Sequence, residues 1–131
     1  MNKEEKEILL RDLCNRLPYN VMCQVEFKED GKYNSKVMLL SGIFTDEAYF
    51  TTKGGSIYSN EYKPYLRPMS SMTEEEQRTL DSMCNGVEMV SRLSGLKMFD
   101  KAFNWLKENH FDYRGLIEKG LAIDATGKNI Y

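Results

Sequence analysis

The densest group of reactive side chains is the run His110-Phe111-Asp112-Tyr113-Arg114, which holds the single histidine. A carboxylate beside an imidazole can orient it for acid–base catalysis, so His110 and Asp112 define a hypothesis of a small enzyme. Local capping explains the same residues without catalysis. Asp112 would cap a following helix, His110 would bond a free carbonyl, and Arg114 would pair with an acid. The sequence favours the capping interpretation.

The cysteines and the acidic cluster suggest no cofactor. Cys84 could act as a nucleophile with His110 as its base, but nothing in the sequence brings the two together. Cys14, Cys23 and Cys84 are odd in number and form no CxxC motif, so neither a disulfide framework nor a zinc site is expected. Glu74–Glu76 match the first turn of a helix better than a metal site. We expect free thiols in a reducing cytoplasm, with no cofactor and no metal.

A second set of residues combines aromatic rings with cations. Rings on a small barrel beside cations can stack nucleic-acid bases, and tyrosine and arginine also anchor protein interfaces. The net charge of −2 and the pI of about 5.5 weigh against nucleic acid. A plain division into core and edge tyrosines remains the simplest interpretation. The candidate binding residues are Lys53, Tyr58, Tyr62, Lys63, Tyr65 and Arg67, with Tyr49 and Phe50 in the same aromatic set.

The first half of the chain predicts one helix and a set of short strands. Residues 2–17 should form a helix capped by Asn2 that ends before Pro18. Alternating apolar residues predict a strand over 21–27, and the branched run 36–44 predicts a central strand with a bulge at Gly42. Strands are also expected at 48–53 and 57–58. The segment 62–67 contains Pro64 and is followed by Pro68, which cannot donate ladder hydrogen bonds, so it should be an edge strand or a polyproline-like exit.

The second half predicts helices. Thr73-Glu74-Glu75-Glu76 fits a capping box that opens a helix ending near Cys84, with a stop at Asn85-Gly86. Helical spacing continues over 87–93, a longer helix is expected over 96–109, and a short one over 113–119. The apolar stripes expected to be buried are Leu10, Leu13, Cys14 and Leu17 in the first helix, and Phe99, Ala102, Phe103 and Leu106 in the long helix.

These elements predict an α+β protein with an N-terminal helix, four or five short antiparallel strands and C-terminal helices. Residues 1–131 should form a single compact domain. Its parts would be a helix with a small sheet over 1–68, a helical region over 73–120 and a mobile tail over 121–131. Residues 20–68 suggest a small barrel of the SH3 or Sm type, and an open meander packed on helices is the alternative.

Three strings also resemble a known family. KPYLRPMSSMTEEE (63–76), NWLKENHFDYRGLIEKGLAI (104–123) and LCNRLPYNV (13–21) are similar to segments of small uncharacterised proteins from Bacteroides-type gut bacteria and from their phages and mobile elements. Residues 33–60 and 85–98 show no such similarity. The family has no established activity, so the resemblance assigns no functional residues. It implies a cytoplasmic protein of phage or mobile-element origin.

The overall composition leaves binding as the favoured function. The first residues contain no apolar run that fits a signal peptide, and no run approaches the length of a membrane span, so a cytoplasmic protein without a membrane role is expected. The sequence favours a non-enzymatic interaction or regulatory module that binds a protein partner or forms a homo-oligomer. A nucleic-acid-binding small barrel and a small enzyme using His110 and Asp112 are the alternatives.

Overall fold

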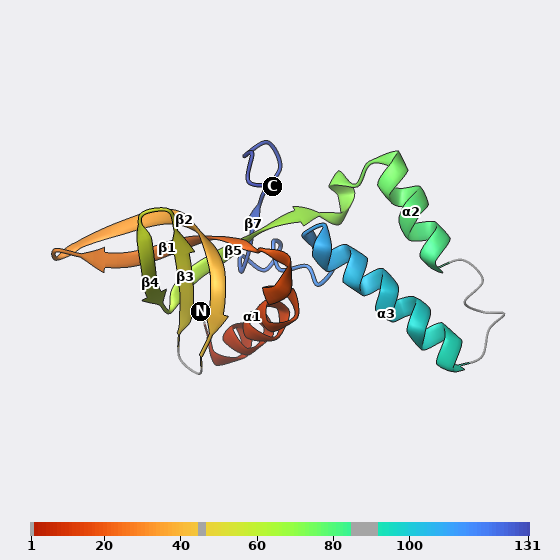
Figure 1. The fold of residues 1–131 in the computed structure, drawn as a ribbon, viewed down its shortest axis with the longest axis horizontal. Helices are drawn as coiled ribbons and strands as arrows, with labels where there is room; N and C mark the ends of the chain where they lie inside the picture. Colours follow the sequence, from red (N-terminus) through yellow and green to blue (C-terminus); the bar gives the residue numbers. More distant parts are fainter. Residues whose placement is uncertain (1, 45–46, 85–91) are drawn as a thin grey trace.

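The fold was analysed in a computed structural model that describes residues 2–44, 47–84 and 92–131. An N-terminal helix is followed by a sheet, two further helices and a C-terminal segment that returns to the sheet (Figure 1). The helices and strands are α1 (Lys3–Arg16), η1 (Leu17–Tyr19), β1 (Met22–Glu29), β2 (Lys32–Ile43), β3 (Ala48–Thr52), β4 (Gly55–Ser59), β5 (Glu61–Pro68), η2 (Met69–Ser71), α2 (Glu74–Cys84), α3 (Arg92–Glu108), β6 (Phe111–Asp112) and β7 (Ile123–Asp124).

Helix α1 begins at the predicted cap. The Asn2 side chain accepts a hydrogen bond from the Glu5 N–H at 2.8 Å, and the Glu5 carboxylate accepts one from the Asn2 N–H at 3.1 Å. The predicted buried stripe is confirmed at Leu13 but wrong at Cys14, which is exposed, and Leu10 is only half-buried. The buried face has the same spacing one position earlier. It consists of Leu9, Asp12, Leu13 and Arg16.

The sheet confirms the predicted α+β class, but it does not form the expected small barrel. The strand order is β4-β3-β2-β1-β5-β6, with β7 pairing β5 from outside this path. Strands β1 to β5 pair antiparallel, while β6 and β7 add to β5 in parallel, so the sheet is mixed. The expected SH3- or Sm-like barrel over 20–68 is not closed. Strand β4 lies at one end of the order and pairs only β3, and α1 covers the inner face where closure would enclose the core.

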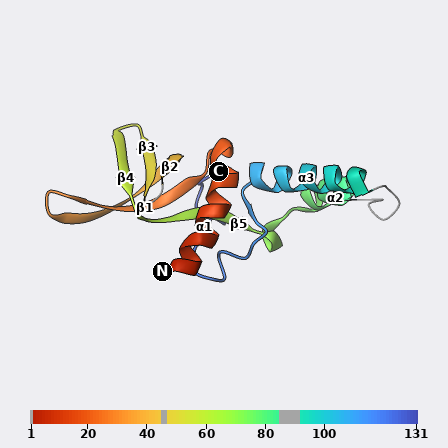
Figure 2. The same ribbon diagram turned by 90° about the horizontal axis from the view of Figure 1, so that it is seen from below.

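One face of the sheet packs on α1 and on the C-terminal segment (Figure 2). The alternation predicted for β1 is confirmed, since Val21, Cys23 and Val25 are fully buried. Burial raises the pKa of the Cys23 thiol well above its ordinary range. The buried cluster contains Leu9, Leu13, Val21, Cys23, Val25, Met38, Leu40, Ala48, Phe50, Tyr62, Leu66, Leu116, Leu121 and Ala122.

Gly42 marks the bulge that the sequence predicts. The β2–β3 register shifts between Leu40 and Gly42, and Gly42 then faces Tyr49. A Cβ at Gly42 would meet the Phe44 ring and the Tyr49 Cβ, each at 3.6 Å, which is ordinary contact. The bulge turns the end of β2 so that Phe44 lies beside the Tyr58 ring, with the ring centroids 5.7 Å apart.

Helices α2 and α3 form a hairpin that extends away from the sheet (Figures 1 and 2). The capping box at the start of α2 is confirmed: the Thr73 hydroxyl accepts from the Glu76 N–H, and the Glu76 carboxylate accepts from the Thr73 N–H, both at 3.1 Å. The predicted burial of α3 is half wrong. Ala102 and Leu106 are buried, but Phe99 and Phe103 are exposed. The expected stop at 85–86 and most of the helical stretch at 87–93 fall outside the described residues.

The C-terminal segment differs from the prediction. Residues 113–119 form turns instead of a helix, although Asp112 caps them as expected, accepting from the N–H groups of Leu116 and Ile117 at 2.9 Å each. Residues 121–131 are expected as a tail, yet Leu121 and Ala122 join the core and β7 pairs with β5. Backbone pairing with β5 and burial of Leu121, Ala122 and Ala125 explain the difference, because both fix the segment against the sheet. No helix within the described residues is long and apolar enough to cross a membrane.

A buried ion pair joins α1 to the second half of the chain. The Arg16 Nε lies 2.7 Å from the Asp12 Oδ2, and the Arg16 Nη2 donates to the Phe111 carbonyl at 2.7 Å. Both side chains are completely buried. Burial raises the pKa of Asp12, against the opposing effect of Arg16. Removing Arg16 would leave the buried Asp12 carboxylate with only the part-exposed Arg114, whose Nε lies 3.4 Å from Asp12 Oδ1, as a counter-charge.

We therefore expect Arg16→Ala to lower the free energy of unfolding by about 3–5 kcal/mol. The exposed Arg11 on the same helix is the matched control, and Arg11→Ala should change stability by less than about 0.5 kcal/mol. Urea denaturation measures both. Because it leaves no uncompensated charge, the double variant Asp12→Leu/Arg16→Met should recover most of the loss. Equal effects of Arg16→Ala and Arg11→Ala would contradict the role assigned to the buried pair.

Candidate functional site

The structure does not assemble an acid–base pair from His110 and Asp112. Both carboxylate oxygens of Asp112 are occupied by the N–H groups of Leu116 and Ile117. The imidazole of His110 instead stacks on the Tyr131 ring, with centroids 3.5 Å apart and planes 8° apart. Asp112 therefore holds the backbone of the next turn and does not orient the imidazole.

His110 is also poorly suited to act as a base. Burial, with smaller contributions from Arg16 and Arg67, lowers its pKa to about 4. The imidazole is neutral at pH 7 and binds a proton weakly. Its Nδ1 is buried and has no hydrogen-bond partner among the described residues. Cys84 is the last residue of α2, and no hydrogen bond within the described chain joins it to His110.

Two of the predicted binding tyrosines are buried. Tyr62 belongs to the core, where its ring lies 5.2 Å from that of Phe50, and burial raises its pKa to about 12. The Tyr65 hydroxyl donates to the Gln24 Oε1 at 2.6 Å. Each residue is 7% exposed. Their rings stabilise β5 against β1 and β3 and offer little surface to a partner.

Arg67 is fully engaged within the protein. Its guanidinium makes a bidentate pair with Glu76, through Nη2 to Oε1 at 2.7 Å and Nη1 to Oε2 at 2.9 Å. The same group lies 4.1 Å from the centre of the Phe111 ring. These contacts fix the start of α2 against β5 and β6. Arg67 thus positions the helical hairpin.

The remaining predicted cations lie far apart in the sheet. Lys53 is in the turn between β3 and β4, at one edge, and Lys63 is on β5, beyond β2 and β1. The nucleic-acid hypothesis needs Lys53, Lys63 and Arg67 free on one face beside exposed tyrosines. The structure brings neither lysine next to Arg67, and Glu76 neutralises Arg67.

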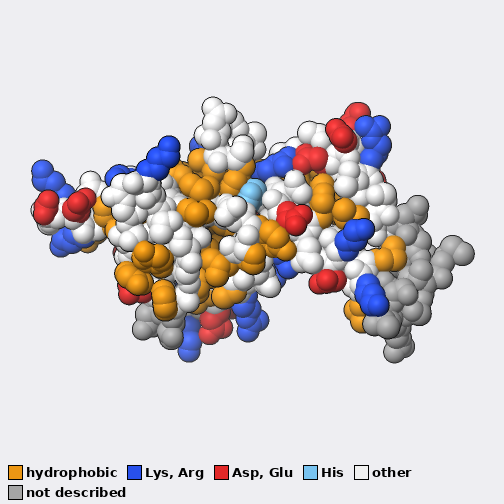
Figure 3. All heavy atoms as spheres, in the orientation of Figure 1, with side chains coloured by type: hydrophobic (Ala, Val, Ile, Leu, Met, Phe, Trp, Pro, Cys, Tyr) orange, Lys and Arg blue, Asp and Glu red, His pale blue; other side chains and the backbone are white. Residues whose placement is uncertain are grey.

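Tyr58 is the one predicted tyrosine that is well exposed. It is 56% exposed and lies 4.9 Å from the Tyr49 ring and 5.7 Å from the Phe44 ring, measured between centroids. The three rings form an aromatic cluster on the outer face of the sheet, in which Tyr49 and Tyr58 are cross-strand partners and Phe44 joins them from the end of β2 beyond the Gly42 bulge. Hydrophobic side chains are visible over the sheet and over the helices at the other end of the molecule (Figure 3).

A second apolar surface lies on α3 and was missed because the sequence predicts Phe99 and Phe103 to be buried. Leu96 is 67% exposed, and Phe99 and Phe103 are each 44% exposed. They are spaced i, i+3 and i+7, so they lie along one side of the helix, and we call them the α3 stripe. The sequence did indicate that part of α3 would stay exposed. The only apolar residues of α2 are Leu80, Met83 and Cys84, which are too few to cover two sides of α3.

Neither a metal site nor a known relative adds to this picture. Among the residues that the structure describes, no group of three or more His, Cys, Asp or Glu side chains could hold a metal ion. No protein-family model matches the chain, and no match was found among curated proteins or solved structures. The exposed surfaces of this molecule are therefore its main functional features.

The Arg67–Glu76 pair predicts a pH dependence of stability. Hydrogen bonding to Arg67 lowers the pKa of Glu76 to about 2, so the pair contributes fully above the unfolded pKa and is lost as the pH falls through the folded pKa. Glu76→Gln should cost about 1–2 kcal/mol at pH 7 and roughly half as much at pH 3. Denaturant titrations at both pH values measure this. Glu74→Gln, also in the first turn but exposed, is the control and should show no comparable change. A cost that does not fall on acidification would contradict the assignment.

Proposed function

We propose that the protein is a non-enzymatic interaction module that binds protein through the α3 stripe. The observation that supports it is the exposure of Leu96, Phe99 and Phe103 on a helical hairpin that extends from the sheet. A cytoplasmic location and an origin in a phage or mobile element belong to the same proposal.

The cost of exposing these side chains supports a binding role. Burial of one leucine or phenylalanine side chain is worth about 1.5–3 kcal/mol, and the stripe leaves three of them partly in water. An apolar strip with polar flanks is typical of helices that dock on other helices. None of the α2 residues is fully buried, so the hairpin forms a thin layer that can accept a second layer.

The distribution of charge on the two helices favours a second copy of this chain as the partner that covers the α3 stripe. Helix α2 is acidic, with Glu74, Glu75 and Asp81 against Arg78, and α3 is basic in its exposed part, with Lys97, Lys101 and Lys107 against Asp100 and Glu108. Two hairpins packed face to face place the acids of one α2 near the lysines of the other α3. A twofold axis forms each such contact twice, as in isologous dimers. The paired hairpins would make a four-helix layer with the two stripes inside.

The test of this proposal is sedimentation of the full chain. We expect a dimer at micromolar concentration, and we expect Phe99→Glu to weaken dimerisation by at least about 100-fold, because it places a carboxylate in the apolar contact. Phe44→Glu is the matched control, since Phe44 is 54% exposed on the sheet. This variant should remain dimeric. Circular dichroism confirms that both variants are folded. A monomeric wild-type protein, or a dimer unaffected by Phe99→Glu, would contradict the proposal.

A further inference from the structure

One edge of strand β5 is only partly covered, and the contacts of two hydroxyl groups show the direction of its backbone groups. At one end, the Ser59 hydroxyl donates to the Glu26 carbonyl at 2.6 Å and accepts from the Glu61 N–H at 3.1 Å. The Ser59 hydroxyl therefore bridges the Glu26 carbonyl of β1 and the Glu61 N–H of β5, which point toward each other. Glu61 turns its N–H toward β1.

The other end of the ladder shows the same direction. The Tyr131 hydroxyl donates to the Tyr65 carbonyl at 2.8 Å and accepts from the Met22 N–H at 3.0 Å. Further along β5, the Arg67 N–H donates to the His110 carbonyl at 2.7 Å, so β6 continues on the side of β1. Because backbone groups alternate along a strand, the odd-numbered residues of β5 face β1 and β6.

The even-numbered residues face the opposite edge. The Leu66 carbonyl accepts from the Ala125 N–H at 2.9 Å, which places β7 on that edge. Pro64 and Pro68 lie on the same side, where their missing N–H groups break no ladder bond. The parallel register of Tyr65 with Ile123 directs the Pro64 carbonyl toward β7, which leaves the N–H and carbonyl of Tyr62 with no strand partner among the described residues. The edge is open just before β7.

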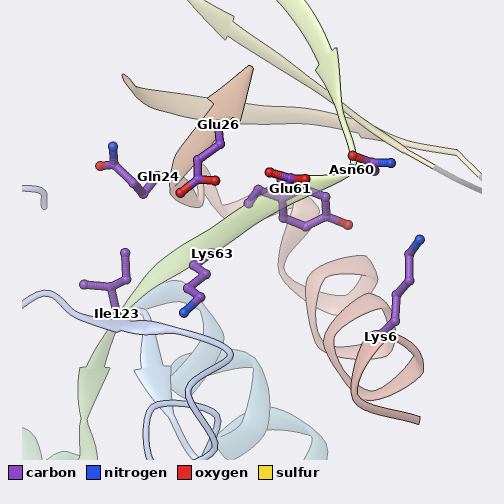
Figure 4. A pocket seen from close by; sticks show the side chains of 8 residues that line it. Lys6, Gln24, Glu26, Asn60, Glu61, Lys63 and Ile123 are labelled. Atoms are coloured by element: carbon purple, nitrogen blue, oxygen red, sulfur yellow. The ribbon is translucent and has the colours of Figure 1, made fainter. Parts of the chain in front are cut away.

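A cleft of about 610 Å³ lies at this open edge (Figure 4). Lys6 projects from α1 on one side of β5, and Gln24 and Glu26 lie on the other side. No salt bridge joins the charged groups of the cleft to one another within the described chain. The lining residues are Lys6, Gln24, Glu26, Asn60, Glu61, Tyr62, Lys63 and Ile123.

We infer that this edge binds an extended peptide segment of a protein partner by strand addition. Tyr62 would give and accept the backbone hydrogen bonds, and the peptide would lie in line with β7. The chain's own β7 already uses this edge in the same way, at Tyr65 and Leu66. An exposed edge that supplies backbone hydrogen bonds, with pockets for alternate side chains, is the basis of strand-addition recognition.

The charged side chains that line the cleft indicate which residue types the peptide should contain. Successive side chains of an added strand point to opposite faces of the sheet. On the α1 side the charged group that lines the cleft is the Lys6 ammonium, while Glu26, Glu61 and Lys63 line the outer side. An acidic residue of the peptide therefore fits toward α1. The prolines limit the paired stretch to a few residues.

Amide hydrogen exchange of the full chain, followed by NMR, tests the geometry directly. The Tyr62 amide should exchange at least about 10-fold faster than the Lys63 amide, because an amide without a partner needs no opening of the sheet. The comparison is made in dilute protein. Equal protection of the two amides would overturn the inference.

Peptide binding tests the ligand class. The probe is a library of random peptides displayed on phage, selected against the wild-type chain. Selected peptides should be rich in acidic residues and should slow exchange at Tyr62. Their affinity should fall at least about 10-fold with Lys6→Glu, because the substitution reverses the charge that faces the peptide. Lys3→Glu, an exposed site on the same helix, is the matched control and should bind normally.

Three further results would overturn the inference. These are a selection without binders, binders that leave Tyr62 exchange unchanged, and protection of Tyr62 that rises with protein concentration in the absence of peptide. The third result would assign the edge to a second copy of the chain. The inference does not rest on the α3 stripe, so Phe99→Glu should leave peptide binding unchanged.

Discussion

The buried guanidinium of Arg16 holds the two halves of this protein together. It pairs with Asp12 one helical turn away and reaches across to the carbonyl of Phe111, the first residue after the α3 region to join the sheet. The Tyr113 ring lies 5.2 Å from the same guanidinium. Because a buried charge must keep its partners, α1, β6 and the end of α3 are fixed relative to one another. The direction in which the α2–α3 hairpin leaves the sheet depends on this contact and on the Arg67–Glu76 pair.

Strand β5 connects most of the other elements to one another. It pairs with β1 along its first half, with β6 and β7 along its second half, and leads directly into the link before α2. Its prolines place their missing donors on the outer edge, so a strand with two prolines still pairs fully with β1. The open part of this edge and the α3 stripe lie on different elements. The two proposed binding surfaces are therefore separate in the fold.

The order of elements from α1 to α3 could be predicted from the sequence because capping boxes, alternation and the glycine bulge are local signals. Asn2, Thr73 and Gly42 act where the pattern places them. The buried side of α1 could not be predicted, since a stripe that contains Asp12 and Arg16 looks polar until the partner carbonyl of Phe111 is known. Burial of Phe99 was predicted in error, because periodicity shows that a face is apolar but not whether anything covers it. For the candidate site, the sequence pointed to Tyr62 and Lys63, but the open edge depends on which side of β5 each N–H faces.

The position of Cys23 has a practical consequence for following the sheet in solution. Its thiol is completely enclosed between β1 and α1, and its raised pKa keeps it protonated, whereas Cys14 lies in the open on the outer side of α1. Thiolate, not thiol, reacts with alkylating reagents, so modification of Cys23 requires the strand to separate from its neighbours. The rate at which Cys23 is alkylated therefore reports how often the core opens. The faster alkylation of the exposed Cys14 measures the reactivity of the reagent under the same conditions.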